Sequence, residues 1–251
     1  MWYSARQNWK KSASRFRISN EAHVSAELGT PQFPQHVPLV IIVSGPAGAG
    51  KTSLVNALLA SSDQFIRAIT CTCRPPRPGE IDGVDYHFLT PELFQRKLKA
   101  GEFLESANVY GYDYGMPAQN VSDALRQGKD LVINIDVQGA ATIRKRACEL
   151  TLDSLGSTVA KRASLSELIV SAFIMPPSLS VLEHRLKKRG TDDEATIKRR
   201  LSVVREEMHR WFEYDFVIVT GALSEDLQRL QGIIAAERMR TKRLELLVQH
   251  G

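Results

Sequence analysis

The chain has 251 residues, 43% of them hydrophobic, and a formal net charge of +5 at pH 7. This size and composition fit an α/β domain with one or two subdomains, and no apolar run is long enough to span a membrane. The positive charge fits an anionic ligand, but no basic module interleaved with aromatic residues is present, so we expect no nucleic-acid partner.

The three cysteines, Cys71, Cys73 and Cys148, form neither a disulfide framework nor a zinc-binding spacing. Cys71 and Cys73 fit small packing residues on one face of a strand, in a reducing compartment. We therefore expect a cytoplasmic protein without a membrane partner. Both a monomer and a homo-oligomer are compatible with the sequence.

Residues 1–37 differ in composition from the rest of the chain. Lysine and arginine dominate their charge, and the first acidic residue is Glu21. Three interpretations remain open: a disordered tail, an organellar transit peptide, and a start codon upstream of the true one. We favour a basic disordered tail with no part in the chemistry, and we expect a second, short tail at 244–251.

The most informative stretch is residues 38–59, PLVIIVSGPAGAGKTSLVNALL. Its apolar run at 39–43 predicts a buried strand of a parallel sheet, and a helix is expected from Lys51. The residues between them match the phosphate-binding pattern G-x-x-x-x-G-K-[ST]. In such a P-loop, backbone N–H groups surround phosphate oxygens, Lys51 neutralises their charge, and the Thr52 hydroxyl can bind Mg²⁺. The stretch predicts a nucleoside triphosphate site.

Three strands and a helix are expected next. Alternating side chains at 67–73 predict a strand that leads into the loop RPPRPGE, residues 74–80. The prolines of this loop fix its backbone, so its arginines Arg74 and Arg77 are presented with less entropy to lose. The other elements are expected at 85–88 (strand), 90–100 (helix capped by Thr90), 103–109 (strand) and 111–115 (hairpin-like turn).

A second buried strand is expected at 131–136, after a helix over about 117–127. It ends in Asp136, a carboxylate that can hold magnesium-bound water beside a triphosphate. An aspartate at a strand end often only caps the next helix. Together with Lys51 and Thr52, however, Asp136 predicts a magnesium site.

Basic residues on both sides of Gly190 mark the last third of the chain. Such charges usually form a solvated helical face, but around a glycine-containing turn they fit a mobile lid over phosphates. The expected elements are a strand at 172–175, a helix from Ser178 to Lys188, a basic helix after 194, a strand at 216–220 and a helix from Ser224 to about Arg243. Alternating strands and helices predict a three-layer α/β fold with a parallel sheet.

Over about residues 38–243 the sequence strongly resembles the guanylate kinases. The order of its motifs is theirs: GPAGAGKT, RPPRPGE, DYHF, FLE, YGYDYG, IDVQG, MPPS and a basic lid ending in RG. The resemblance implies a P-loop fold with a small mixed GMP-binding subdomain at about 70–116 and a helical lid at about 185–200. It implies an enzyme of purine nucleotide metabolism that transfers the γ-phosphoryl group of ATP to GMP or dGMP, with Mg²⁺.

The resemblance also implies roles for individual residues. The ATP phosphates and Mg²⁺ would be held by the P-loop residues Gly45, Pro46, Ala47, Gly48, Ala49, Gly50, Lys51, Thr52 and Ser53. The acceptor would be held by Arg74, Arg77, Tyr86 and Tyr114 at its phosphate and by Thr70 and Glu105 at its guanine, with Asp136 near the acceptor and the metal. The catalytic cations would be Lys51, Arg74, Arg185, Arg189 and Arg200.

The chemistry of these residues agrees with the implied roles. Guanine presents adjacent N–H donors that one carboxylate accepts together, whereas adenine would leave a buried Glu105 unpaired. Arginine makes bidentate, charge-assisted bonds with phosphate, and lid arginines would neutralise charge and exclude water on closure. Without the family match, Tyr86 and Tyr114 would be ordinary packing residues and Glu105 a surface charge.

The sequence departs from the family pattern at several positions. Met116 stands where a small hydroxyl residue is usual, Asn134 where an aspartate is usual, and Thr220-Gly221 where Asn-Asp is usual near the adenine. These departures affect base selectivity and metal binding rather than the fold. Residues 149–170 are longer than the usual link and suggest a surface insertion.

Three other functions are compatible with a P-loop in this setting. A non-catalytic guanylate-kinase-like binding module usually has a degraded P-loop, whereas Lys51 and Thr52 are intact here. A kinase for another phosphate acceptor is favoured by Met116 and opposed by Glu105 and Thr70. A P-loop GTPase switch would need an N-K-x-D run, which the chain lacks. Guanylate kinase is the preferred prediction.

Overall fold

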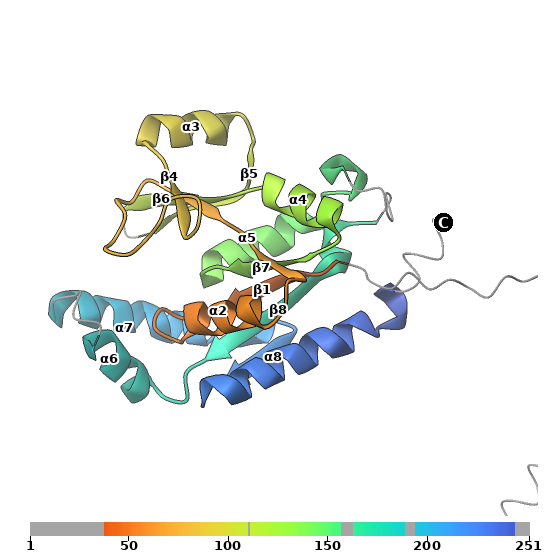
Figure 1. The fold of residues 1–251 in the computed structure, drawn as a ribbon. Helices are drawn as coiled ribbons and strands as arrows, with labels where there is room; N and C mark the ends of the chain where they lie inside the picture. The colour runs from red at the N-terminus through yellow and green to blue at the C-terminus, as the bar shows by residue number, and fades with distance from the viewer. Residues whose placement is uncertain (1–37, 110, 157–162, 189–193, 244–251) are drawn as a thin grey trace, which may run out of the picture. The chain divides into compact units, whose positions relative to one another are not determined.

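A computed structural model of the protein describes residues 38–109, 111–156, 163–188 and 194–243 (Figure 1). The tails expected at 1–37 and 244–251 lie outside these residues, as does the lid turn at 189–193. No helix in the described part of the chain is both long enough and apolar enough to cross a membrane.

A five-stranded parallel sheet forms the core, in the order β2-β7-β1-β8-β9. The central strand β1 pairs with both β7 and β8, so that Val40 lies between Leu131 and Ile169. The strands are β1 (Val40–Ser44), β2 (Phe65–Arg67), β7 (Asp130–Asn134), β8 (Ile169–Met175) and β9 (Phe216–Val219).

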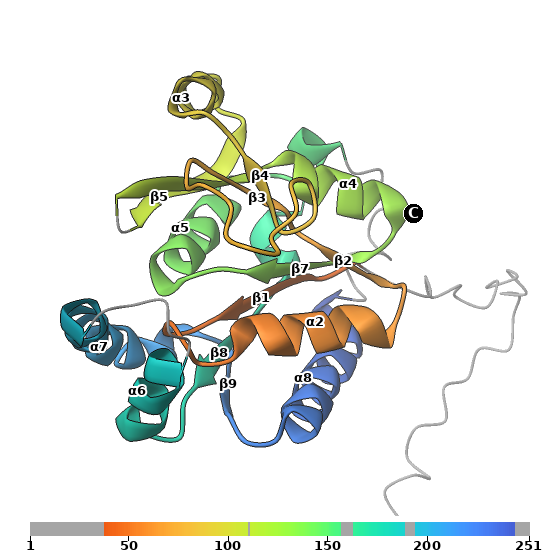
Figure 2. The same cartoon turned by 60° about the vertical axis from the view of Figure 1, so that its left-hand side comes forward.

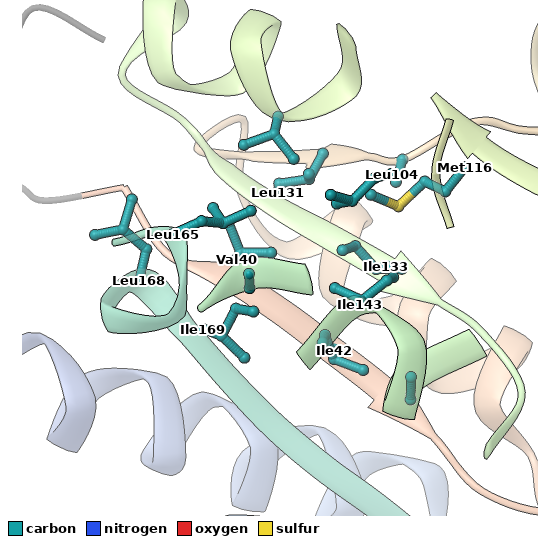
Figure 3. Close-up of a cluster of buried hydrophobic side chains, with 14 of the residues drawn as sticks. Val40, Ile42, Leu104, Met116, Leu131, Ile133, Ile143, Leu165, Leu168 and Ile169 are labelled. Atoms are coloured by element: carbon teal, nitrogen blue, oxygen red, sulfur yellow. The ribbon is translucent and has the colours of Figure 1, made fainter. Parts of the chain in front are cut away.

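Helices cover both faces of this sheet (Figures 1 and 2). Helices α2 (Lys51–Ser61) and α8 (Leu223–Arg238) cover one face, and α4 (Gln119–Gln127) and α5 (Val137–Ala147) cover the other. Side chains of β1 alternate between the two layers because successive residues of a strand point to opposite faces. Ile41 therefore packs in the cluster of α2 and α8, and Ile42 in the cluster of α5 (Figure 3). The predicted three-layer fold is confirmed.

A second, mixed sheet is formed within residues 70–117, one residue more than the predicted range of 70–116. Its order is β4-β3-β6-β5, with β3 parallel to β4 and the other pairs antiparallel. The strands are β3 (Thr70–Thr72), β4 (Tyr86–Phe88), β5 (Phe103–Val109) and β6 (Tyr112–Pro117), and the helix α3 (Pro91–Lys99) packs on them. Phe94 of α3 stacks on Phe103 with ring centroids 4.7 Å apart. Leu104 and Met116 extend the main core (Figure 3).

Two helices, α6 (Leu179–Lys188) and α7 (Glu194–Met208), occupy the region expected for the lid. Ser178 caps α6 as predicted, since its hydroxyl oxygen accepts a hydrogen bond from the backbone N–H of Val181 at 3.2 Å. Leu182 and Val204 are buried between the helices, in a small cluster separate from the main core. The two helices therefore pack as a pair with apolar contacts of their own.

Two strand predictions were wrong in their extent. The strand expected at 67–73 is two strands, β2 in the core sheet and β3 in the second sheet, and the chain changes sheets after Ala68, whose N–H still bonds to the Val132 carbonyl at 2.9 Å. The turn expected at 111–115 is strand from Tyr112, because Tyr112 to Gly115 pair with β5.

The segment 149–170 was expected on the surface, and its described part is mixed: Glu149, Thr151, Asp153, Ser154, Gly156 and Glu167 are exposed, whereas the four leucines from 152 to 168 and residues 169–170 are buried. Two short 3₁₀ helices, η2 (Asp153–Leu155) and η3 (Leu165–Leu168), carry leucines into the cluster beneath α4 and α5. β8 also begins at Ile169 rather than at Ala172, so the end of the segment belongs to the core sheet. The segment therefore contributes its apolar side chains to the hydrophobic core, while most of its polar residues stay exposed.

The C-terminal helix differs from its prediction at both ends. Ala222, not Ser224, is the N-cap residue, and Asp226 accepts the N–H of Gly221 at 3.1 Å, which fixes the chain at the helix entry. The helix ends at Arg238. Arg243 then folds back and is buried, donating to the Glu237 carboxylate at 2.8 Å and to the Ile169 carbonyl at 3.0 Å.

Candidate active site

A cavity of about 670 Å³ lies where the P-loop faces the second sheet. Its wall is formed by the P-loop and the start of α2, by the residues that follow β7, by strands β3 to β6 with the loop before β4, and by the turn between β9 and α8. Residues from segments far apart in the sequence therefore line one cavity.

Glycines give the P-loop its shape. Gly45 has a φ of +142°, and a Cβ added there would lie 2.4 Å from the carbonyl oxygen of Ile174, so no other residue fits. Gly50 is the left-handed N-cap of α2, which begins at Lys51. The Lys51 ammonium group donates to the carbonyl oxygens of Gly45 at 2.7 Å and Pro46 at 3.0 Å. The loop thus combines a helix N-terminus with a cation.

The two residues predicted to bind magnesium both line the cavity. The Thr52 hydroxyl accepts a hydrogen bond from the side-chain amide of Asn134 at 3.1 Å. Asp136 is the N-cap of α5, where its carboxylate accepts the N–H of Gly139 at 2.8 Å. The structure therefore gives Asp136 a capping role.

The donor set fits Mg²⁺ bound through phosphates. No group of three or more His, Cys, Asp or Glu side chains suited to a metal occurs within the described ranges. Mg²⁺ usually takes one or two protein oxygens and keeps its other positions for phosphate and water. A hydroxyl and a carboxylate beside a P-loop meet that requirement.

Glu105 is a buried carboxylate in the cavity wall, with only 3% of its surface exposed. Burial, and then the negative charge of Asp136, raise the pKa of Glu105 to about 7, while a hydrogen bond from the backbone N–H of Met116 opposes the rise. Gly139 makes room for this carboxylate, because a Cβ there would lie 3.3 Å from Oε2 of Glu105. The side chain of Met116 is fully buried in the core instead.

Thr70, Tyr86 and Tyr114 line the cavity on the second sheet. Thr70 pairs with Tyr86 across β3 and β4. The rings of Tyr86 and Tyr114 meet edge to face at 6.1 Å. Burial raises the pKa of the Tyr86 phenol, so its hydroxyl is a hydrogen-bond donor at neutral pH.

The two loop arginines are placed differently. The exposed Arg77 lines the cavity, whereas Arg74 is 8% exposed and is not part of the cavity wall. Nη2 of Arg74 lies 2.8 Å from both carboxylate oxygens of Glu80, and its Nε donates to the Tyr114 hydroxyl at 3.1 Å. The guanidinium also lies over the Tyr86 ring, 5.5 Å from its centroid.

The predicted lid arginines are only partly placed. Arg185 falls within α6 and Arg200 within α7, and Arg189 lies outside the described residues. Helix α7 also carries Glu207, which the sequence analysis missed. Burial raises the pKa of Glu207, the nearby Lys51 ammonium opposes that rise, and the carboxylate accepts the N–H of Ala47 in the P-loop.

Other cavity residues were also missed. The wall includes Arg67, Glu80, Asp85 and Asp226. Glu80 belongs to the motif RPPRPGE, so its position beside two arginines was a usable signal. Arg67 ends a short strand and donates to the side-chain oxygen of Asn56. Nothing in the neighbouring sequence identifies it as a cavity residue.

The fold and the site together define a P-loop α/β protein of the nucleotide-binding class, with a cavity at the carboxyl edge of its parallel sheet. The family model for guanylate kinase matches residues 38–152 and 144–237. The chain belongs to the guanylate kinase family.

Individual relatives agree with this assignment. A guanylate kinase of Nitrosospira multiformis is 40% identical over 210 residues, which cover 84% of this chain and 90% of the relative. One of Alcanivorax borkumensis is 42% identical over 202 residues, with 80% and 88% covered. The crystal structure of guanylate kinase from Anaplasma phagocytophilum is 30% identical, with a TM-score of 0.64 over 85% of this chain and 95% of that one.

Proposed function

We propose that the protein is a guanylate kinase that transfers the γ-phosphoryl group of ATP to GMP or dGMP and releases ADP and GDP. The observation that carries the proposal is a buried carboxylate, Glu105, in the same cavity as an intact P-loop. One end of the cavity is suited to a triphosphate, and the other presents an acceptor for the adjacent N–H donors of guanine. The family assignment supports both roles.

At the donor end, the backbone of residues 45–52 would hold the ATP phosphates. Lys51 would exchange its two carbonyl partners for phosphate oxygens, because a charge-assisted bond with a phosphate is stronger than a bond with a neutral carbonyl. Thr52 and Asp136 would hold Mg²⁺, which supplies charge neutralisation at the phosphates when bound. Asn134 would orient the Thr52 hydroxyl.

At the acceptor end, Glu105 would accept the N1–H and the exocyclic amine of guanine, and Thr70 would add a hydroxyl. The acceptor phosphate would be surrounded by Arg74, Arg77, Tyr86 and Tyr114. It would present one of its oxygens to the γ-phosphorus. Arg77, Tyr86 and Tyr114 line the cavity, and Arg74 lies behind Glu80, which also lines it. Alignment would therefore be the main contribution of the second sheet.

In the reaction, the bond between the γ-phosphorus and the bridging oxygen to the β-phosphate breaks. A bond forms between the γ-phosphorus and an oxygen of the acceptor phosphate, and ADP keeps the bridging oxygen. Lys51 would stabilise the charge on the transferring group, and Arg185, Arg189 and Arg200 would join it on closure of the α6–α7 pair.

Two alternatives predict different behaviour. A kinase for another phosphate acceptor would keep the donor end and change the acceptor, and Met116, buried in the core, contributes no hydroxyl that would restrict the base. A non-catalytic binding module would show no turnover. The intact Lys51 and Thr52 favour an enzyme over such a module.

The test is a coupled assay of ADP formation with ATP and Mg²⁺, in which GMP, dGMP, AMP, UMP, CMP and ribose 1,5-bisphosphate are offered separately. We expect turnover with GMP and dGMP alone. Preference for another acceptor would retain the kinase and replace the substrate. Absence of turnover with every acceptor, despite ATP binding, would favour the binding module.

A further inference from the structure

Glu80 occupies an anion site that is already formed in the second sheet. Its two carboxylate oxygens both lie 2.8 Å from Nη2 of Arg74, and Oε2 also accepts the backbone N–H of Arg77 at 2.7 Å. The hydroxyl of Tyr114 accepts from the same guanidinium, and Tyr86 lies beneath it. The chain's own carboxylate is therefore bound by groups that suit a phosphate.

The position of Arg74 explains why an anion is present there. A guanidinium that is 8% exposed carries a large desolvation cost, and a buried cation without a partner strongly destabilises a fold. Glu80 lines the cavity and Arg74 does not, so the carboxylate stands on the cavity side of the ion pair. An acceptor phosphate that uses Arg74 has to replace Glu80.

We propose that Glu80 is a specificity-determining residue of the acceptor site, which holds the phosphate clamp of Arg74 and the Arg77 N–H until a dianionic phosphate monoester displaces it. This inference rests on the proposed function, because it takes the clamp to be the acceptor's phosphate site. Glu80 selects acceptors by charge rather than by base.

The selection follows from the charges of the two competing anions. A carboxylate carries one negative charge, whereas a phosphate monoester carries close to two at pH 7 and has three strong acceptor oxygens. Phosphate can therefore bond to Arg74 and to the Arg77 N–H more strongly than the carboxylate does. A nucleoside without a phosphate, or with a singly charged substituent, does not gain enough to open the clamp.

The exchange lowers the apparent affinity for the acceptor. A site that is open only part of the time binds with its intrinsic affinity multiplied by the open fraction. Removing the charge of Glu80 raises that fraction. The substitution Glu80→Gln keeps the size of the side chain and one oxygen acceptor for the Arg77 N–H, so the loop retains its turn.

The test is calorimetric titration of GMP, and separately of guanosine, into the full-length protein without ATP. The variants are Glu80→Gln, Glu80→Ala and, as a matched control, Asp85→Asn. Asp85 also lines the cavity and accepts a backbone N–H of the same loop, from Ile81 at 2.9 Å, but it forms no hydrogen bond or ion pair with Arg74 or Arg77. The control removes the same charge without opening the clamp.

We expect Glu80→Gln to bind GMP about tenfold more tightly than the wild type, with the affinity for guanosine unchanged. Asp85→Asn should change the affinity for GMP less than threefold. If Glu80→Ala is unstable without a ligand, GMP should raise its melting temperature more than that of the wild type, since the phosphate replaces the missing anion.

Weaker binding of GMP by Glu80→Gln would overturn the proposal and make Glu80 a residue that positions Arg74. An equal gain in Asp85→Asn would also overturn it, because long-range charge would then explain the effect. Failure of the wild type to bind GMP would reject the proposed function together with this inference. If the wild type binds GMP, the result with Glu80→Gln tests the inference alone.

Discussion

The two ends of the cavity are built in different ways. The end assigned to the donor consists mainly of one continuous segment, residues 45–52, which would bind phosphate chiefly through backbone N–H groups and one lysine. The end assigned to the acceptor consists of side chains from β3, β4, β5, β6 and a proline-rich loop, held by the Arg74–Glu80 ion pair and by strand pairing. Under the proposed function, phosphate binding would therefore depend on local backbone shape, whereas recognition of the acceptor would depend on the packing of the second sheet.

The largest effect is expected at the donor end. Lys51→Ala removes the only P-loop cation, so turnover should fall on the order of a thousandfold. The fold should be unchanged, because the helix and strand on either side remain. Steady-state kinetics and thermal unfolding measure the two properties, and Lys99→Ala on the exposed face of α3 is the control. Wild-type turnover in Lys51→Ala would reject the phosphate role.

Glu105→Ala tests the separation of the two ends. The KM for GMP should rise about 100-fold, because two charge-assisted hydrogen bonds to guanine are lost, while the KM for ATP changes little. Glu102→Ala is the matched control, since Glu102 lies outside the cavity wall. Equal changes in both KM values would show that the ends are not independent and would reject guanine recognition by Glu105.

Gly139→Ala tests whether recognition of the acceptor depends on packing, because it adds one methyl group and changes no charge. A Cβ at Gly139 would lie 2.5 Å from the Ile135 side chain and 3.3 Å from Oε2 of Glu105, so we expect the KM for GMP to rise about tenfold and the stability to fall by about 1–3 kcal/mol. Gly232→Ala in α8 is the control, because nothing lies within 4 Å of its added Cβ. An unaltered KM would mean that Glu105 tolerates displacement.

The smallest effect is a pH dependence confined to the acceptor end. Guanine needs the ionised form of Glu105, whose pKa is raised to about 7, so the KM for GMP should rise about fivefold from pH 7 to pH 6 and fall above pH 7. Without GMP the sign is opposite: a raised pKa favours the folded protein at low pH, and this stability is lost as the pH rises through 7.

Kinetics across this pH range in the wild type and in Glu105→Gln give the measurement. The variant should show only the weaker dependence that comes from the acceptor's own phosphate, whose second pKa is near 6. Parallel profiles in the two proteins would assign the pH dependence to the phosphate or to another group.

The sequence was sufficient to predict the strand, loop and helix at the donor end because these residues are contiguous. Within residues 38–59, the apolar run, the glycine spacing and the helical period predict a strand, a loop and a helix. An apolar run likewise predicts the buried strand that leads to Asp136. Glu105 and Thr70 came from the family resemblance alone. Nothing local distinguishes Glu105 from a surface charge, since its burial is created by α5 and β6.

Several structural details could not be predicted for the same reason. Alternation with a period of two is identical in both sheets, so it does not reveal that the chain changes sheets after Ala68. The pairing of Glu80 with Arg74 depends on how the loop folds back at Gly79, which has a φ of +87°. The leucines between 152 and 168 have no regular period, and their burial depends on α4 and α5 being in place.

Arg243 ties the segment after α8 to the start of β8, through the carbonyls of Glu167 and Ile169 and the buried carboxylate of Glu237. β8 lies next to the central strand and is followed in the chain by α6 and α7. During synthesis on the ribosome, the partners of β8 therefore remain incomplete until residue 243 has left the exit tunnel. The nascent chain would have its phosphate loop long before it could complete its core, so the order of translation places nucleotide-binding elements ahead of the contacts that stabilise them.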